Sequence, residues 1–515
     1  MATKMIVVSN RLPFVLKRNE KGELTREAST GGLVTAVAPV VVKSGGTWVG
    51  WPGIHLSDSD KIPESDPSDK TPGLKSKQVI PVDLDDEEYQ LYYNGCCNAS
   101  FWPLFHSMPD RAIFDQSWWQ AYQKVNHKFA LRTLTALRKT LEAHPDSVPL
   151  IWIHDYHLMM AANSIRQVAD EENLSCKIGF FLHIPFPPWD MIKIFPWSDM
   201  ILQGILGCDL VGFHIQDYCL NFIDCCQRGL GCRVDRQSLL AEHGHRTVRI
   251  RSLPIGIPYA RFEEMSKSAP KTLDNERIQY ILGVDRLDYT KGLVNRILSI
   301  EKLLDAHPEY LEKVIFMQIA VPYRTDVKEY QDLKEEMDKL IGRINGRFST
   351  ANWSPIRYIY GCISQDELAG FYRDVDVALV TPLRDGMNLV AKEFVACRTA
   401  KPGVLILSQF AGAGEMMHEA LSVNPYDISN VASVLHRYEM SQQVLGFSII
   451  SMIVKYMVIF LIEITYSPVK LKASYLRMFQ YPQVEGKMAQ KYVTCFFIDQ
   501  SSTKKGQLAI TLEGY

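Results

Sequence analysis

The stretch LVTPLRDGMNLVAKEF (379–394) passes from an apolar run through Arg-Asp-Gly into an amphipathic segment. Leu379 and Val380 are typical of the end of a buried strand, and residues 389–394 carry apolar side chains at helical spacing. The first amides of such a helix have no partners inside it, and they lie at the positive end of its dipole. This turn therefore suits an anion or the hydroxyl groups of a sugar.

The same turn also has a purely structural explanation. Asp385 can cap the helix while the residues after it pack against their neighbours. Taken alone, the stretch favours that explanation. Glu393 lies four residues after Leu389 and returns to the same face of the helix one turn deeper.

Similar short apolar runs recur along the chain, and most of them end in polar or charged residues. Continuous apolar runs of this length fit parallel strands that are buried on both faces. Helix-like stretches lie between several of them, such as 120–143 and 326–341. The alternation predicts a doubly wound α/β architecture. The runs are 4–11, 148–157, 177–186, 208–214, 278–288, 313–324, 356–362, 376–386 and 402–412.

The ends of these runs predict where a ligand binds. In open parallel sheets, ligands bind beyond the carboxyl ends of the strands. One charge after one strand can arise by chance, but the same pattern after most strands indicates a crevice. The residues at these positions are Arg11, Asp155, His183, Arg286, Asp288, Arg324 and Asp385.

The length of the chain predicts two domains or more, because single cores stop growing well below 515 residues. Segment 253–275 mixes Pro and Gly with polar residues and is typical of a connection between domains. We place a first domain at 1–255, a second at 256–440 and a separate tail at 441–515. A crevice between two α/β domains can accept a substrate from each side.

Composition restricts the partners and the compartment. The net charge of −2 argues against a general nucleic-acid binder, so phosphate recognition must be local. The eleven cysteines form no CxxC pair, which argues against a disulfide framework or a zinc site. The first residues, MATKMIVVSNR, lack the pattern of a signal peptide. We expect a cytoplasmic location.

The segment GVDRLDYTKGL (283–293) places Arg286 and Lys291 around a turn after a predicted strand. Two cations there can neutralise a diphosphate leaving group, with about 1.5–3 kcal/mol from each charge-assisted hydrogen bond. The alternative is a surface pairing of Arg286 with Asp285 or Asp288, which contributes little. The sequence leaves both open.

The segment IWIHDYHL (151–158) suggests a metal site or an acid–base pair, but no further ligands follow at matching spacing. Asp155 fits better as a hydrogen-bond acceptor for sugar hydroxyls. A lone histidine such as His183 is more often structural. Tyr93 and Trp102 offer aromatic faces for a sugar, although most such side chains belong to the core.

Glycines before a helix provide a weaker signal. Gly31 and Gly32 would let backbone amides approach a phosphate, although a glycine pair is usually only a turn. The chain has no G-x-G-x-x-G that opens a helix after the first strand, and no G-x-x-x-x-G-K-[ST]. A dinucleotide cofactor or a P-loop is not expected.

Taken together, these segments resemble the trehalose-6-phosphate synthase family of retaining glycosyltransferases. They cover roughly the first 435 positions in order, which is more specific than any single motif. The resemblance implies two Rossmann-like doubly wound domains that face a cleft, the GT-B architecture. The matching stretches are VVSNRLP, TGGL, YYN…FWP, IWIHDYHL, GFFLHIPFP, PIGI, DRLDYTKGL, GRINGRF, TPLRDGMNLVAKEF and VLILSQFAGAGE.

The resemblance implies transfer of glucose from UDP-glucose to glucose 6-phosphate, with no cofactor and no metal. It implies that Glu393 takes the ribose hydroxyls, that His183 and Asp385 hold the donor glucose, and that two arginines meet the acceptor phosphate. The implied catalytic residues are His183, Asp385, Arg286 and Lys291. The implied donor site is Gly31, Gly32, Arg286, Lys291, Asp385, Gly386, Met387, Asn388, Leu389, Val390 and Glu393. The implied acceptor site is Arg11, Tyr93, Trp102, Asp155 and Arg324.

The likeness stops after residue 440. Residues 444–462 are a nearly continuous apolar run that contains Lys455. This run has three interpretations: a transmembrane helix, a segment that packs into the second domain, or an alternative or misread end of the coding sequence. The abrupt transition favours the last, and we do not expect a membrane partner.

The unmatched tail leaves two further functions open. The chain can be a catalytically impaired regulatory subunit, because in the family a terminal helix braces the domains. It can also be a UDP-glucose transferase with another acceptor. The sequence is compatible with a homo-oligomer.

Overall fold

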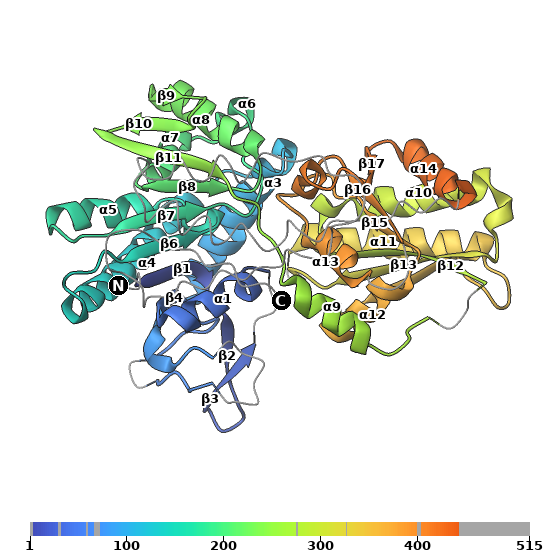
Figure 1. The fold of residues 1–515 in the computed structure, drawn as a ribbon, viewed down its shortest axis with the longest axis horizontal. Coiled ribbons are helices and arrows are strands. Elements are labelled where there is room, and N and C mark those ends of the chain that lie inside the picture. Colours follow the sequence, from blue (N-terminus) through green and yellow to red (C-terminus); the bar gives the residue numbers. More distant parts are fainter. Residues whose placement is uncertain are drawn as a thin grey trace, which may run out of the picture.

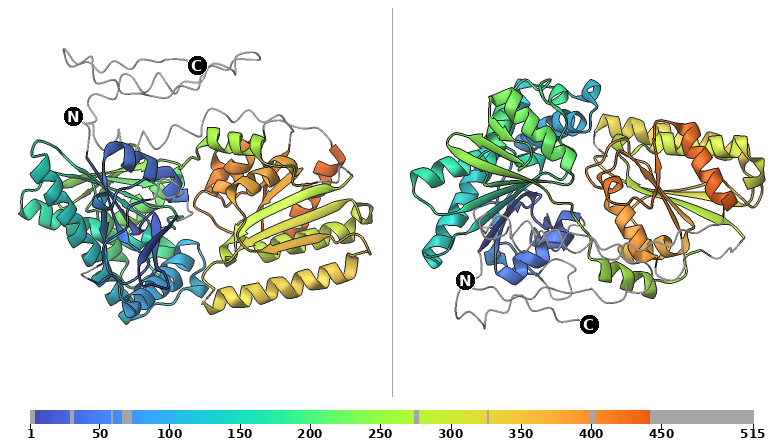
Figure 2. Two further views of the ribbon diagram at one scale, coloured as in Figure 1. Left: turned by 90° about the horizontal axis from the view of Figure 1, so that it is seen from below. Right: turned by 45° about the horizontal axis from the view of Figure 1, so that its top comes forward.

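The structure, a computed structural model, describes residues 4–28, 32–57, 60–65, 73–273, 277–325, 327–398 and 403–441. Two sheets lie side by side, one in each half of the chain (Figure 1). Figure 2 shows the same two halves from two further directions. The predicted α/β class with parallel sheets is confirmed.

The first sheet has nine strands in the order β5-β4-β1-β6-β7-β8-β11-β10-β9. Six of its parallel strands are β1, β4, β5, β6, β7 and β8. When these are numbered 1 to 6 along the chain, their order in the sheet is 3-2-1-4-5-6, which is typical of doubly wound nucleotide-binding folds. A separate antiparallel hairpin is formed by β2 (Phe14–Arg18) and β3 (Leu24–Ala28). The strands of the sheet are β1 (Met5–Arg11), β4 (Thr47–Trp51), β5 (Val79–Pro81), β6 (Leu150–His154), β7 (Lys177–Phe181), β8 (Leu210–Phe213), β9 (Arg233–Asp235), β10 (Leu240–His243) and β11 (Arg246–Ser252).

The second sheet has six strands in the order β14-β13-β12-β15-β16-β17, and all its neighbours are parallel. It repeats the 3-2-1-4-5-6 order, so the strand order reverses between β12 and β15 as it does between β1 and β6. Such switch points are where doubly wound sheets bind ligands. The strands are β12 (Gln279–Arg286), β13 (Val314–Val321), β14 (Ile356–Tyr360), β15 (Val377–Val380), β16 (Val404–Ser408) and β17 (Leu421–Val423).

Helices cover both sheets (Figure 1). Those of the first half are α1 (Gly32–Ser44), α2 (Asp86–Glu88), the π-helical η2 (Tyr89–Phe101), α3 (Trp102–Phe105), α4 (Gln116–Ala143), α5 (Ala161–Glu171), α6 (Trp189–Ile192), α7 (Ser198–Ile205) and α8 (Gln216–Leu230). Those of the second are α9 (Tyr259–Ser268), α10 (Leu293–Ala306), α11 (Lys328–Phe348), α12 (Gln365–Asp374), α13 (Leu389–Cys397) and α14 (Ile428–Ser441). The short 3-10 turns are η1 (Ser76–Gln78), η3 (Pro109–Arg111), η4 (Tyr156–Leu158), η5 (Tyr289–Lys291), η6 (Pro308–Tyr310) and η7 (Gly412–Glu415).

Each predicted apolar run contains one strand of the structure, and the two predicted helical stretches overlap α4 and α11. The segment 253–275, which the sequence predicts to be a connection between domains, contains a helix instead: α9 occupies its middle and packs on α12 and α13. The predicted boundary after residue 255 lies in the coil between β11 and α9.

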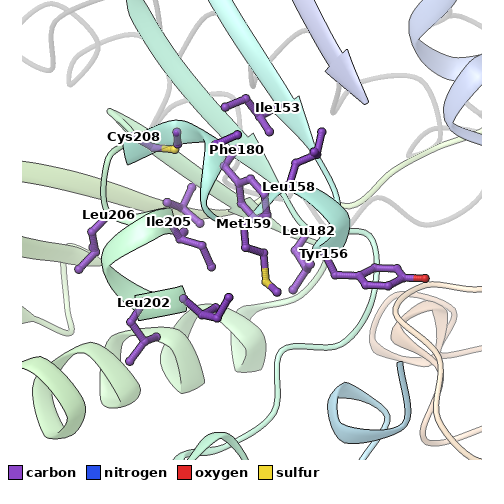
Figure 3. Packing of buried hydrophobic residues seen from close by; sticks show 14 of the residues in the cluster. Ile153, Tyr156, Leu158, Met159, Phe180, Leu182, Leu202, Ile205, Leu206 and Cys208 are labelled. Carbon is purple, nitrogen blue, oxygen red and sulfur yellow. The ribbon is translucent and has the colours of Figure 1, made fainter. Parts of the chain in front are cut away.

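Buried apolar side chains hold the site loops on the first sheet. Figure 3 shows part of this core, in which Ile153, Phe180 and Met159 pack together, while the ring of Tyr156 points out of the cluster. Among the described cysteines, all but Cys362 are buried and none is paired. None of the described helices is long and apolar enough to cross a membrane, and the run 444–462 lies outside the described residues.

Candidate active site

Four of the seven predicted strand-end residues lie at the two switch points. Arg11 is the last residue of β1, and Asp155 directly follows β6. In the second half, Arg286 is the last residue of β12, and Asp385 follows β15 after a short turn. The fold therefore brings these residues, which are far apart in the sequence, to the region where the halves meet.

Trp102, at the start of α3, lies beside two cations of the second half. Its ring centre is 5.7 Å from the Cζ atom of Arg286 and 4.8 Å from that of Arg324. Arg324 also donates a hydrogen bond from Nη2 to the hydroxyl of Tyr156, at 3.3 Å. Because Trp102 and Tyr156 belong to the first half, these contacts join the two halves directly at the predicted site.

Two tyrosines that the sequence patterns did not single out support the same cations. The Cζ atoms of Arg286 and Arg324 lie 4.2 and 4.4 Å from the ring centre of Tyr323. The Nη1 of Arg324 donates to the hydroxyl of Tyr330 at 2.6 Å. Among the described residues, neither arginine forms an ion pair with a carboxylate. Two guanidinium groups held close together suit an anionic ligand, and, against the opposing effect of burial, the charges of both already lower the pKa of the buried Asp288 carboxyl.

Arg11 belongs to the same group of residues. Its Nη2 donates to the hydroxyl of Tyr89 at 3.2 Å, and its Cζ lies 5.6 Å from the ring centre of Tyr93. Tyr93 in turn stacks on His157, with ring centres 5.7 Å apart. Burial lowers the pKa of His157 well below its usual value, and the charges of Arg324 and Arg11 lower it further. The charges of both arginines therefore act on one histidine.

Asp155 is held in a conformation that is unusual for its residue type. Its φ is 74°, and its Oδ1 accepts a hydrogen bond from the backbone N–H of His183 at 3.2 Å. Burial raises the pKa of Asp155 to about 6. A backbone strain of about 1–3 kcal/mol at such a residue is typical of functional sites.

Lys291 and Asp385 form the central ion pair of the predicted donor site. Their Nζ and Oδ2 atoms are 2.6 Å apart, and the side chains are 9% and 14% exposed. Burial by itself would raise the pKa of Asp385, but the Lys291 ammonium outweighs it and keeps this pKa below its ordinary value. The carboxylate is therefore ionised.

The structural explanation of the Asp385 turn is wrong in its cap, although the residues after Asp385 do pack in the core. The residue that caps α13 is Asn388, whose Oδ1 accepts from the N–H of Ala391 at 3.3 Å. Asp385 lies three residues too early to reach the helix amides, and it accepts instead from Nδ2 of Asn388 at 3.2 Å. The capping position is thus filled while Asp385 keeps its contact with Lys291.

The Asp385 turn also contacts the first half. A Cβ atom on Gly386 would lie 2.3 Å from the carbonyl oxygen of His183, so only glycine fits here. The hydroxyl of Tyr218 in α8 donates to the carbonyl oxygen of Asp385 at 3.3 Å. The structure therefore brings the predicted glucose-binding residues His183 and Asp385 together across the two halves.

The rest of the predicted donor site follows on α13. Glu393 accepts a hydrogen bond from the Tyr372 hydroxyl at 3.2 Å, and burial raises its pKa to about 7. The remaining predicted donor residues have these places: Met387 is buried before α13, Leu389 and Val390 are half-buried at its start, Gly32 begins α1, and Gly31 lies outside the described residues.

The pairing of Arg286 with Asp285 is wrong. Asp285 is buried and forms an ion pair with Arg296, at 2.8 Å. Arg296 also donates to Thr381 Oγ1 at 2.9 Å and to Gln318 Oε1 at 3.1 Å. Local sequence patterns do not predict this network beneath the site, because an arginine inside a helical segment carries no signal of burial.

One cluster of metal-type ligands occurs among the described residues. Side-chain atoms of His307, Glu309 and His436 lie within 4.8 Å of one another. The cluster lies past the C-terminal end of α10, whereas Lys291 precedes the N-terminal end of that helix. It contains none of the predicted site residues.

Comparisons with known proteins agree with this geometry. The family model described as Glycosyltransferase family 20 matches residues 3–443. An alpha,alpha-trehalose-phosphate synthase [UDP-forming] from Botryotinia fuckeliana is 38% identical over 444 residues, with 84% of this chain and 82% of the relative covered. The 56 kDa subunit of such a synthase from Kluyveromyces lactis is 40% identical over 441 residues, with 84% and 87% covered.

Solved structures extend the likeness to the fold. A crystal structure of a UDP-forming alpha,alpha-trehalose-phosphate synthase from Burkholderia xenovorans, in complex with glucose-6-phosphate, is 33% identical. It superposes with a TM-score of 0.73 over 86% of this chain and 93% of that one. The site geometry, the repeated strand order and a family match over most of the sequence agree, and this chain belongs to glycosyltransferase family 20.

Proposed function

We propose that this chain transfers glucose from UDP-glucose to glucose 6-phosphate, with retention at the anomeric carbon, and forms trehalose 6-phosphate and UDP. The observation that carries the proposal is the group of cations at the contact between the halves. Arg286 and Arg324 share the Tyr323 ring, and Lys291 lies beside Asp385. Both proposed substrates carry phosphate, and cations near the reacting groups suit each of them.

The chemistry of the donor explains why these cations are needed. Cleavage of the bond between glucose and UDP develops negative charge on the diphosphate. Arg286, Lys291 and the amides at the start of α13 would stabilise this charge, with about 2.7–4 kcal/mol lost when one such donor is removed. Glu393 would accept from the ribose hydroxyls. His183 and Asp385 would hold the glucose.

The acceptor would lie on the side of the first sheet. The charges of Arg11 and Arg324 both lower the pKa of His157, and together these arginines would bind the phosphate of glucose 6-phosphate. Asp155 would accept from the sugar hydroxyls, with Tyr93 and Trp102 as the aromatic walls. The proposal requires no metal, because these side chains supply the positive charge.

The test is UDP release by purified chain 1–515 with UDP-glucose, in the presence and absence of glucose 6-phosphate. Acceptor-dependent release that survives a chelator is the expected result. Free glucose and fructose 6-phosphate serve as control acceptors. Faster release with either control would assign another acceptor.

If no UDP is released, a measurement of UDP binding distinguishes two explanations. If UDP still binds by calorimetry, the site is formed but does not turn over, and the chain is a regulatory subunit. If UDP does not bind, the assignment of the donor site to α13 and Lys291 is wrong. We further propose a cytoplasmic location, which fractionation of the producing cells would test.

A further inference from the structure

Two histidines form a hydrogen-bonded pair behind the proposed glucose site. His154 is the last residue of β6 and is 1% exposed, and His183 lies two residues after β7 and is half-buried. The Nδ1 of His154 lies 3.1 Å from the Nε2 of His183. A hydrogen bond between two ring nitrogens requires that one donates and the other accepts.

Both rings are neutral at physiological pH. Burial lowers the pKa of His183 to about 3, and burial with the nearby His183 ring lowers the pKa of His154 well below its usual value. The surrounding rings of Trp152, Phe181 and His214 carry no charge that would oppose this, since burial keeps His214 neutral as well. Each ring therefore carries one N–H, and the pair can exist in two tautomeric arrangements.

The other nitrogen of His154 distinguishes the two arrangements. Its Nε2 is buried and has no hydrogen-bond partner among the described residues. If His183 donated to His154, then this Nε2 would carry a buried N–H without an acceptor, at a cost of about 1–3 kcal/mol. If His154 donates, its Nε2 is only an unpaired acceptor, and buried acceptors without a partner are more common in proteins than buried N–H groups without one. The geometry favours His154 as the donor.

We propose that His154 is a positioning residue that holds His183 as its Nδ1–H tautomer, so that His183 presents an N–H to a hydroxyl of the donor glucose. The Nδ1 of His183 bonds to no described residue. The assignment of the sugar to this ring rests on the proposed function, whereas the tautomer itself rests only on the histidine pair.

The backbone of His183 is already fixed on two sides. Its N–H donates to Oδ1 of Asp155 at 3.2 Å, and its carbonyl oxygen lies against Gly386. The remaining freedom at this residue is the position of the ring proton. A partner on the ring is therefore the group that decides whether His183 donates to a hydroxyl or accepts from it.

The matched variants are His154→Asn and His154→Leu. Asparagine and leucine have the same branched shape, but only asparagine places an N–H donor at the position of Nδ1. Both variants leave the same space where the ring was, so the difference between them isolates the hydrogen bond. Thermal unfolding of the two variants measures the shared packing loss.

The kinetic readout separates positioning from general damage. We expect His154→Leu to lower kcat/KM for UDP-glucose by about 10–100-fold, as for other partners that orient a functional histidine. His154→Asn should stay close to wild type. The affinity for UDP, which lacks the glucose, should be the same in all three proteins by calorimetry.

The second readout needs no turnover. Nitrogen-15 NMR of the histidine rings, with the His183 signals identified by their loss in His183→Asn, reports which nitrogen carries the proton. We expect Nδ1–H in the wild type and in His154→Asn, and loss of this preference in His154→Leu. Equal kinetics of the two variants, or Nε2–H in the wild type, would overturn the inference. A wild type without glucose 6-phosphate-dependent UDP release would instead overturn the proposed function and leave the NMR result intact.

Discussion

The proposed function assigns different substrates to single residues at the site. Arg324 donates to the hydroxyls of Tyr156 in the first half and Tyr330 in the second, and the proposed function places it on the acceptor side. Glu393 lies one turn into α13, and the proposed function places it on the donor side. Because the two residues would contact different ligands, their effects on binding can be separated.

Replacing Arg324 by alanine should raise the KM for glucose 6-phosphate by about 10- to 150-fold, the loss of one hydrogen bond between charged groups. The affinity for UDP should stay nearly unchanged by calorimetry. Arg286→Ala is the matched control and should weaken UDP binding. If Arg324→Ala also weakens UDP binding strongly, Arg324 belongs to the donor side.

The affinity for UDP should rise between pH 6 and pH 8. Burial raises the pKa of Glu393 to about 7, and only the ionised carboxylate accepts from both ribose hydroxyls. Titration calorimetry across this range measures the effect, which Glu393→Gln should flatten. An unchanged pH dependence in that variant would remove Glu393 from the ribose site.

Glu393 also affects stability in a defined direction. Its folded pKa of about 7 is above the ordinary value of 4.5, so the folded protein binds the proton more tightly than the unfolded chain does. This contribution to stability is present in full below pH 4.5 and is lost as the pH rises towards 7.

At the scale of elements, a buried charge network joins the strands of the second sheet below the site. Arg296 projects from α10 and bonds to side chains on β12, β13 and the residue after β15. It also donates to the carbonyl oxygen of Lys291, at 3.4 Å. The network thereby connects the sheet with the turn that carries the Lys291–Asp385 pair.

Replacing Arg296 by methionine should destabilise the protein by about 3–5 kcal/mol, because it leaves the buried Asp285 carboxylate unpaired. Urea unfolding measures the change, and the added substitution Asp285→Asn should recover part of it. Arg343→Met is the control, since Arg343 pairs with Glu301 on the exposed side of α11 and should cost less than about 1 kcal/mol. Equal losses in the two single variants would contradict the role of the network.

At the scale of the whole molecule, the two halves meet through backbone as well as side chains. Gly386 contacts the His183 carbonyl, and Nζ of Lys392 donates to the carbonyl oxygen of Ile255 at 2.6 Å. Together with the contacts of Trp102, they set how closely the donor and acceptor sides approach. A transfer reaction depends on this approach, because a misplacement of about 1 Å can lower the rate by about 100-fold.

Replacing Gly386 by alanine should therefore lower kcat by up to about 100-fold, because its Cβ would separate the turn from His183. Gly414→Ala is the control, since the nearest atom to its Cβ would be 3.4 Å away, an ordinary contact. Steady-state kinetics and thermal unfolding of both variants measure the effect. Normal turnover by Gly386→Ala would show that this contact does not set the approach.

The sequence by itself determined the α/β class, nine of the described strands and the family. Each of these depends on local patterns: apolar runs of strand length, helical spacing, and charged residues directly after strands. The places of Arg11, Asp155, Arg286 and Asp385 at strand ends follow from the same patterns, because parallel strands put their carboxyl ends at one edge.

Only the tertiary structure decided which of these residues are partners. The Asp285–Arg296 pair, the contact of Arg324 with Tyr156 and the histidine pair behind the proposed glucose site join residues 11, 168 and 29 positions apart. Such partners are selected by burial and by the packing of segments that are distant in the sequence, and local spacing encodes neither. The roles assigned to the site residues remain predictions, whereas the meeting of the two halves at His183 and Gly386 is a property of the folded chain, because backbone contacts of this kind arise only when both sheets have formed.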